Sequence, residues 1–91
     1  MKEKRKSAVA LKYNKDNSVP IVVAKGRGHI AEKIIETAKE NKVEIYEDED
    51  VADSLMKLEM GMEIPQELYE AVAEIIAYIY NLNMYRGESH E

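Results

Sequence analysis

The stretch that decides the fold is residues 60–82, MGMEIPQELYEAVAEIIAYIYNL. Pro65 and Glu67 indicate the start of a long helix, because proline fits the first turn and an acidic side chain there complements the helix dipole. Two apolar stripes follow at helical spacing. One consists of Leu68, Val72, Ile75, Ile79 and Leu82, and the other of Tyr69, Ala73, Ile76 and Tyr80. Together they predict a helix that packs against the protein along much of its length.

The first half of the chain supplies elements on which this helix can pack. Residues 8–13, AVALKY, and 19–24, VPIVVA, predict two strands joined by a turn-rich loop at residues 14–18. A helix is expected at about residues 29–40, and residues 43–46, VEIY, predict a third strand. Because a strand, a helix and a strand in succession favour parallel pairing, while the first two strands favour a hairpin, the sequence predicts a mixed sheet.

A second, shorter helix is expected between the third strand and the long helix. Asp48 is placed to cap its N-terminus, and Val51, Leu55 and Leu58 recur at helical spacing on its inward side. Asn41 is expected to close the preceding helix in a left-handed conformation. The predicted fold class is α/β, a small mixed sheet of about three strands with three main helices packed around it. The expected divisions are a flexible basic N-terminus at 1–7, a domain at 8–82 and a polar tail at 83–91.

Composition and charge limit the classes of function. The chain has 91 residues, enough for one domain, and no cysteine, so neither a disulfide nor thiolate chemistry is expected. Without a run of about 18 apolar residues or an apolar leader, the chain is predicted to be cytoplasmic and not inserted in a membrane. Residues 1–42 hold 11 Lys and Arg against 5 Asp and Glu, whereas residues 43–91 hold 2 against 13. The net charge of −5 argues against a free nucleic-acid binder, although a basic patch used for binding stays an alternative.

One motif has the form of a phosphate-binding turn. Gly26, Gly28 and Ala31 match Gly-x-Gly-x-x-Ala directly after a predicted strand. Lys25 and Arg27 add positive charge beside the expected helix start, where backbone N–H groups can hold an anion. A dinucleotide crevice, however, needs a larger parallel sheet than this chain can build. The alternative interpretation is that the two glycines make a tight turn between strand and helix.

Nothing else in the sequence indicates catalysis. His29 and His90 have no nucleophile and carboxylate at a recognisable spacing, so no enzymatic activity is expected. The acidic run at residues 47–50 lacks the glycine and alternating ligands of a calcium loop, so neither a metal nor a cofactor is expected. A nucleotide-dependent enzyme stays open as an alternative, which thermal stabilisation by a dinucleotide would reveal.

The order of the motifs resembles a known family. Residues 8–13, AVALKY, are followed by 20–26, PIVVAKG, by a helix with Ile30, Ala31 and Ile34, and by 63–80, EIPQELYEAVAEIIAYIY. This succession over roughly residues 8–82 is similar to the cytoplasmic C-terminal domain of the FlhB/YscU family, the export-switch proteins of flagellar and related type III secretion systems. The resemblance implies an α/β domain that helps choose which substrates the export apparatus accepts.

The chain departs from that family's pattern at its N-terminus. Family members carry a membrane domain and an Asn-Pro-Thr-His motif, whose asparagine cyclises and cuts the chain. The aligned positions here are residues 3–6, EKRK, with Ser7 in place of a tyrosine. Glu3 has no side-chain amide to attack the next carbonyl, so self-cleavage is expected to be absent. The family's strand that precedes this motif is also missing here. The resemblance therefore implies a free-standing homologue with one sheet edge open to a strand from a partner.

The resemblance also implies a docking patch. Substrate docking in the family is attributed to an apolar patch where the start of the second strand meets the last helix, and the matching positions are Val19, Pro20, Ala73 and Ile76. Val19 and Pro20 are expected to be exposed, whereas Ala73 and Ile76 fit core packing equally well. The prediction is a non-enzymatic protein-binding module of flagellar or type III export, with export substrates or apparatus proteins as partners. The alternative is a small anion- or RNA-binding domain that uses residues 25–28.

Overall fold

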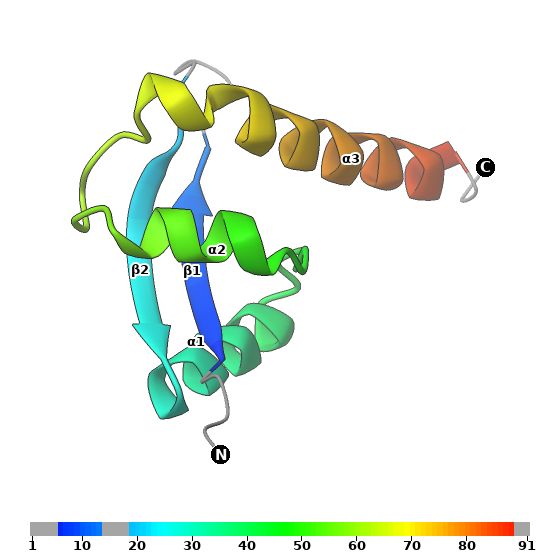
Figure 1. Ribbon diagram of the computed structural model, residues 1–91. Coiled ribbons are helices and arrows are strands. Elements are labelled where there is room, and N and C mark those ends of the chain that lie inside the picture. The colour runs from blue at the N-terminus through cyan, green and yellow to red at the C-terminus, as the bar shows by residue number, and fades with distance from the viewer. Residues whose placement is uncertain (1–5, 14–18, 89–91) are drawn as a thin grey trace.

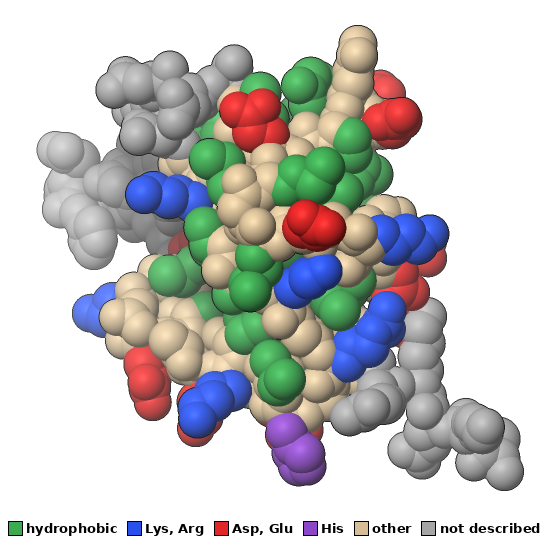
Figure 2. Space-filling view, turned by 90° about the vertical axis from the view of Figure 1, so that its left-hand side faces the viewer, with side chains coloured by type: hydrophobic (Ala, Val, Ile, Leu, Met, Phe, Trp, Pro, Cys, Tyr) green, Lys and Arg blue, Asp and Glu red, His purple; other side chains and the backbone are tan. Residues whose placement is uncertain are grey.

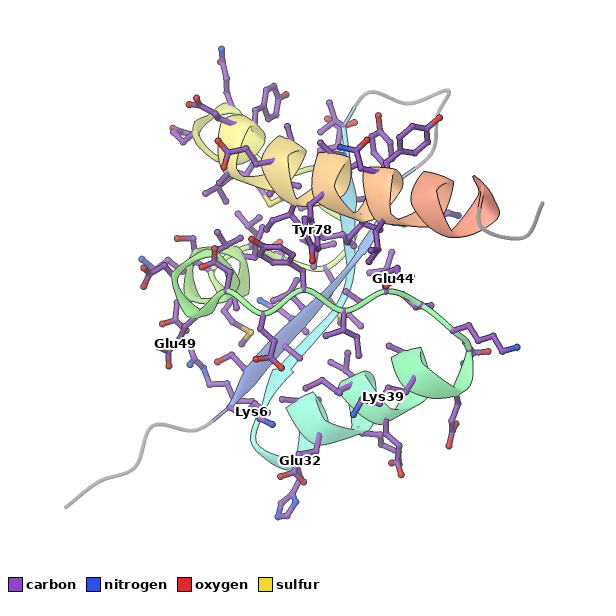
Figure 3. The ribbon with its side chains drawn as sticks, turned by 90° about the vertical axis from the view of Figure 1, so that its right-hand side faces the viewer. Lys6, Glu32, Lys39, Glu44, Glu49 and Tyr78 are labelled. Atoms are coloured by element: carbon purple, nitrogen blue, oxygen red, sulfur yellow. The ribbon has the colours of Figure 1, made fainter. Side chains whose placement is uncertain are left out.

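The chain folds into a short antiparallel sheet with a layer of helix on each face. The computed structural model describes residues 6–13 and 19–88, with side chains described as far as Leu82. Its elements are β1 (Ser7–Lys12), β2 (Ile21–Arg27), α1 (His29–Glu40), α2 (Glu49–Met56), the 3-10 helix η1 (Gln66–Leu68) and α3 (Tyr69–Glu88). Helix α2 crosses one face of the sheet and α1 lies on the other, while α3 crosses the end where β2 begins (Figures 1 and 3). The predicted α/β class with three main helices is therefore confirmed over the described residues.

A bulge in the sheet decides which side chains face which helix. Ala10 lies opposite Ala24 and Leu11 lies opposite Val22, so Val23 is an extra residue on β2. An extra residue reverses the alternation of side chains along a strand. As a result Leu11 and Val22 contribute to the core on the α2 side. Ala10 and Ala24 lie beneath α1 instead.

The prediction of a third, parallel strand at residues 43–46 is wrong. In the described part of the chain the sheet has two antiparallel strands, and residues 43–46 take part in no ladder. The outer edge of β2 is instead met by the segment before η1, where the Val22 N–H donates to the Met62 carbonyl over 3.0 Å and the Gly61 N–H donates to the Val22 carbonyl over 2.7 Å. Because this segment occupies the edge beside β2, the chain leaving α1 runs on to α2 without pairing there.

The helix ends follow local chemistry, with one correction. The Asp48 side chain accepts a hydrogen bond from the Val51 N–H over 3.1 Å, which confirms the predicted cap of α2. Asn41 is not the left-handed residue after α1, because its φ is −99°. Its side chain donates to the Thr37 carbonyl over 2.8 Å, and Lys42 takes the positive φ of 59° instead.

The core lies between the α2 face of the sheet and the start of α3. It is centred on four buried side chains, Val22, Leu55, Ile64 and Val72. Partly buried neighbours complete it, namely Val9, Leu11, Val19, Val51, Leu58, Leu68 and Ile76. Each of these comes from a predicted strand, from the predicted inward side of α2, or from the long helix and the turn before it. The predicted inward side of α2 is therefore confirmed.

Helix α3 is less covered than the sequence predicts. Among its described side chains only Val72 is buried. The helix extends well beyond the sheet in Figure 1 and runs to Glu88, so residues 83–88, expected to belong to a polar tail, continue it. No described helix is both long and apolar enough to cross a membrane. Of the flexible N-terminus expected at 1–7, residues 1–5 lie outside the described residues, as does the expected loop at 14–18, while Ser7 is the first residue of β1.

Candidate functional site

The four positions of the predicted docking patch lie around the junction of β2 and α3. Val19 is half-buried and, like Ile76, packs against the core cluster from the outside. Pro20 is buried, so its expected exposure is wrong. Its carbonyl accepts the Ile64 N–H over 3.1 Å, which holds it beneath the segment before η1. Ala73, in contrast, is exposed on α3.

The second apolar stripe of α3 explains why Ala73 is exposed. Leu68 and Val72, in the first stripe, belong to the core, which turns the second stripe partly away from the protein. Tyr69 is 43% exposed and Tyr80 is 53% exposed, so both ends of that stripe face solvent. Tyrosine combines a large apolar ring with a polar tip and is common at protein interfaces. An apolar strip of one long helix, bounded by two tyrosines, is therefore open to contact. We call Tyr69, Ala73, Ile76 and Tyr80 the α3 stripe.

A third tyrosine of this helix faces a different part of the molecule. Tyr78 points from α3 towards the connection between α1 and α2 (Figure 3). Its ring meets that of Tyr46 edge to face, with the ring centroids 5.4 Å apart and an angle of 75° between the planes. This contact lies off the α3 stripe and ties the projecting helix to the α1–α2 connection.

The phosphate-binding interpretation of residues 25–28 depends on two cations that the structure directs elsewhere. The Lys25 ammonium donates to the Met56 carbonyl over 3.0 Å and to the Leu58 carbonyl, at the end of α2. The Arg27 guanidinium donates to the Ser7 hydroxyl over 3.0 Å and lies 3.8 Å from the carboxylate of Asp53 on α2. Both cations therefore serve the α2 side of the sheet, while the start of α1 lies on the other side.

The two glycines of the motif have a structural role at the turn. A Cβ on Gly26 would lie 2.1 Å from Cγ2 of Ile30, so only glycine allows α1 to approach the strand this closely. Gly28 has a φ of 62°, a left-handed conformation that favours glycine. Its N–H donates to the Lys6 carbonyl over 2.8 Å. The geometry thus favours the tight-turn interpretation, and anion binding at these residues stays a prediction.

Another apolar surface is present on the described part of the molecule. A groove of about 370 Å³ lies beneath α1, where the small side chains Ala10 and Ala24 leave space below Ile34 and Ala38. On the face shown in Figure 2, hydrophobic side chains are scattered among charged ones. No group of His, Asp or Glu among the described residues is arranged to hold a metal ion.

The fold defines the class of this protein, a small α/β domain with one face of its long helix left uncovered. The chain belongs to the FlhB HrpN YscU SpaS family, whose sequence model matches residues 5–79. This agrees with the resemblance carried by the AVALKY, PIVVAKG and EIPQELY motifs. The family comprises components of flagellar and type III protein export.

Individual relatives and solved structures agree with this assignment. The chain is 42% identical to the protein YlqH of Bacillus subtilis over 79 residues, which are 86% of this chain and 85% of that protein. It is 46% identical over 74 residues to the flagellar biosynthetic protein FlhB of Aquifex aeolicus, covering 79% of this chain and 21% of that relative's length. The cytoplasmic domain of FlhB from Shewanella putrefaciens superposes with a TM-score of 0.83 at 34% identity, over 90% of this chain and 69% of that one.

The α3 stripe has an acidic border that the sequence analysis did not single out. Glu70 and Glu74 are exposed on α3, and neither makes an ion pair with another described residue. No lysine or arginine occurs between Lys57 and Arg86, so nothing within this stretch of sequence offsets their charge. That gap in the distribution of cations was the signal available in the sequence.

Proposed function

We propose that this chain is a non-enzymatic protein-binding module of a flagellar or type III export system. The single observation that carries the proposal is the α3 stripe, in which Ala73, Tyr69 and Tyr80 are exposed. Ala73 and the half-buried Ile76 are two of the four positions that the family resemblance marks as a docking patch. A partner that covers the stripe buries apolar surface of Ala73 and two tyrosines, which is the usual source of affinity in protein interfaces. The partners are export substrates or proteins of the export apparatus.

A second contact of the same module is strand addition at β1. Within residues 6–13 and 19–88, the only ladder partner of β1 is β2. An edge strand presents unpaired N–H and C=O groups that an extended segment can use. The outer edge of β2, in contrast, is hydrogen-bonded to residues 61–64. Strand addition by a partner would therefore take place at β1, where it would displace the connection between α1 and α2, which runs past that side of the sheet (Figures 1 and 3).

The test of the docking patch uses Ala73→Asp. Because Ala73 is exposed, the substitution removes no packing and should lower the free energy of unfolding by no more than about 1 kcal/mol, through helix propensity and the nearby Glu70. It puts an unpaired charge into the proposed interface, so we expect at least about tenfold weaker binding of a purified flagellar export substrate, measured by calorimetry. Val19→Asp is less suitable for this test, because Val19 packs on the core.

Val43→Asp is the matched control for this experiment. Val43 is 58% exposed, lies outside the α3 stripe and lines the groove under α1. The control adds the same charge at another exposed apolar position, so it should leave substrate binding unchanged. If Val43→Asp weakens binding and Ala73→Asp does not, the substrate uses the groove and the α3 stripe is not the docking site.

A further inference from the structure

The α3 stripe lies between the body of the protein and a row of carboxylates. Successive residues of a helix are about 100° apart around its axis, so Glu70 is about 100° from Tyr69, and Glu74 is about 100° from Ala73. Ala77 lies between the stripe and these acids, and its side chain is too small to separate a bound partner from them. On the opposite side the stripe meets the core through Ile76. A partner on the stripe therefore has acidic groups along one border.

Glu70 and Glu74 are spaced to act together on a partner. They are four residues apart and so occupy the same side of the helix one turn from each other. Both are exposed and neither forms an ion pair within the described part of the chain. Covering the neighbouring stripe removes water from one side of these carboxylates, which makes an opposite charge on the partner favourable and a like charge costly.

We propose that the segment that docks on the α3 stripe is apolar and carries Lys or Arg along one side, facing Glu70 and Glu74. This inference rests on the proposed function and specifies the chemistry of its partner. The same carboxylates disfavour nucleic acid and anionic membrane surfaces, whose phosphates would be repelled at this border. The partner is therefore a polypeptide segment with alternating apolar and basic sides.

The experiment compares two synthetic peptides that share an apolar helical stripe and differ only in the residues along its border. One carries lysines there and the other carries glutamates. We expect the lysine peptide to bind the full chain at least about tenfold more tightly at 0.1 M salt, where the screening length is about 10 Å. At 1 M salt, where it is about 3 Å, the preference should fall to less than about threefold.

Paired charge reversals distinguish an effect of the acidic border of the α3 stripe from an effect of the overall negative charge of the chain. Glu70→Lys with Glu74→Lys should abolish the preference for the lysine peptide. Glu36→Lys with Glu40→Lys is the matched control, because these residues are also exposed and four apart, on α1. Ala73→Asp should weaken binding of the lysine peptide even though it adds negative charge, since it interrupts the apolar stripe.

Three results would overturn this inference. The first is that the two peptides bind equally well. The second is that the α3 and α1 charge reversals change the peptide preference equally. The third is that the Ala73→Asp variant binds the lysine peptide more tightly than the wild type does. The parallel measurement with a purified export substrate separates this inference from the proposed function. If Ala73→Asp weakens substrate binding and the α3 reversal does not, the docking site stands and its charge preference is refuted. If neither variant affects the substrate, the proposed function fails as well.

Discussion

Lys25 shows how one side chain separates two interpretations of the same motif. In sequence it stands beside a glycine-rich helix start and adds positive charge to a candidate anion site. In the structure its ammonium reaches the carbonyl of Met56, which lies in the last turn of α2 where carbonyls lack helical partners, and the carbonyl of Leu58 just beyond the helix. A cation there also complements the helix dipole. Lys25 therefore anchors α2 to β2, which is a structural role.

Replacing Lys25 with methionine should destabilise the protein. The substitution keeps much of the length of the side chain but removes the donor for two partly buried carbonyl groups. We expect the free energy of unfolding to fall by about 1–3 kcal/mol, measured by urea denaturation. Lys33→Met, at an exposed position on α1, is the control and should change it by less than about 0.5 kcal/mol.

The same variant tests the anion-binding alternative. Inorganic phosphate should not raise the melting temperature of the wild-type protein any more than that of Lys25→Met, because Lys25 is engaged on the α2 side. Stabilisation of the wild type by phosphate that disappears in Lys25→Met would instead support a phosphate site at residues 25–28.

At the scale of the elements, the sequence predicts helices better than strand pairing. Asp48 and the spacing of Val51, Leu55 and Leu58 fix the start and the buried side of α2 from local information alone. The prediction that residues 43–46 pair with β2 is wrong because residues 61–64, which are distant in sequence, occupy the edge of β2. The two stripes of α3 were visible in the sequence. Which stripe is buried depends on the position of Val22 and Leu55, and no local pattern reports that.

Hydrogen exchange tests whether the edge of β1 away from β2 is free to pair with another strand. Amides of β1 that donate to β2 should be protected, whereas those that point away from β2 should exchange at least about a hundredfold faster in the isolated protein, because they lack a partner. Amides of β2 provide the internal comparison, since Val22 donates to Met62 on the outer side. Full protection of every amide in residues 8–13 would mean that the edge is already covered and would remove the basis for strand addition.

At the scale of the whole molecule, the uneven charge of the sequence becomes two differently charged regions. The basic half contains the strands and α1, and the acidic half contains α2 and α3. The halves meet where Arg27 lies 3.8 Å from Asp53, a partly exposed pair that contributes little stability by itself. Glu70 and Glu74 on α3 make no such pair within the described part of the chain and remain available to a partner. The family resemblance predicts a docking position at Ala73. The lack of Lys and Arg between Lys57 and Arg86 was visible in the sequence, whereas the position of Glu70 and Glu74 beside the α3 stripe depends on the side on which α3 packs.

Chemical-shift mapping tests the docking surface most directly. The ¹⁵N-labelled protein is titrated with a purified flagellar export substrate, and the perturbed amides are placed on the structure. The account predicts that the largest changes fall on the α3 stripe, Tyr69 to Tyr80, and next to it at Val19. Changes confined to the groove under α1, around Ala10, Ala24 and Val43, or the absence of any change at a substrate concentration of about 1 mM, would contradict it.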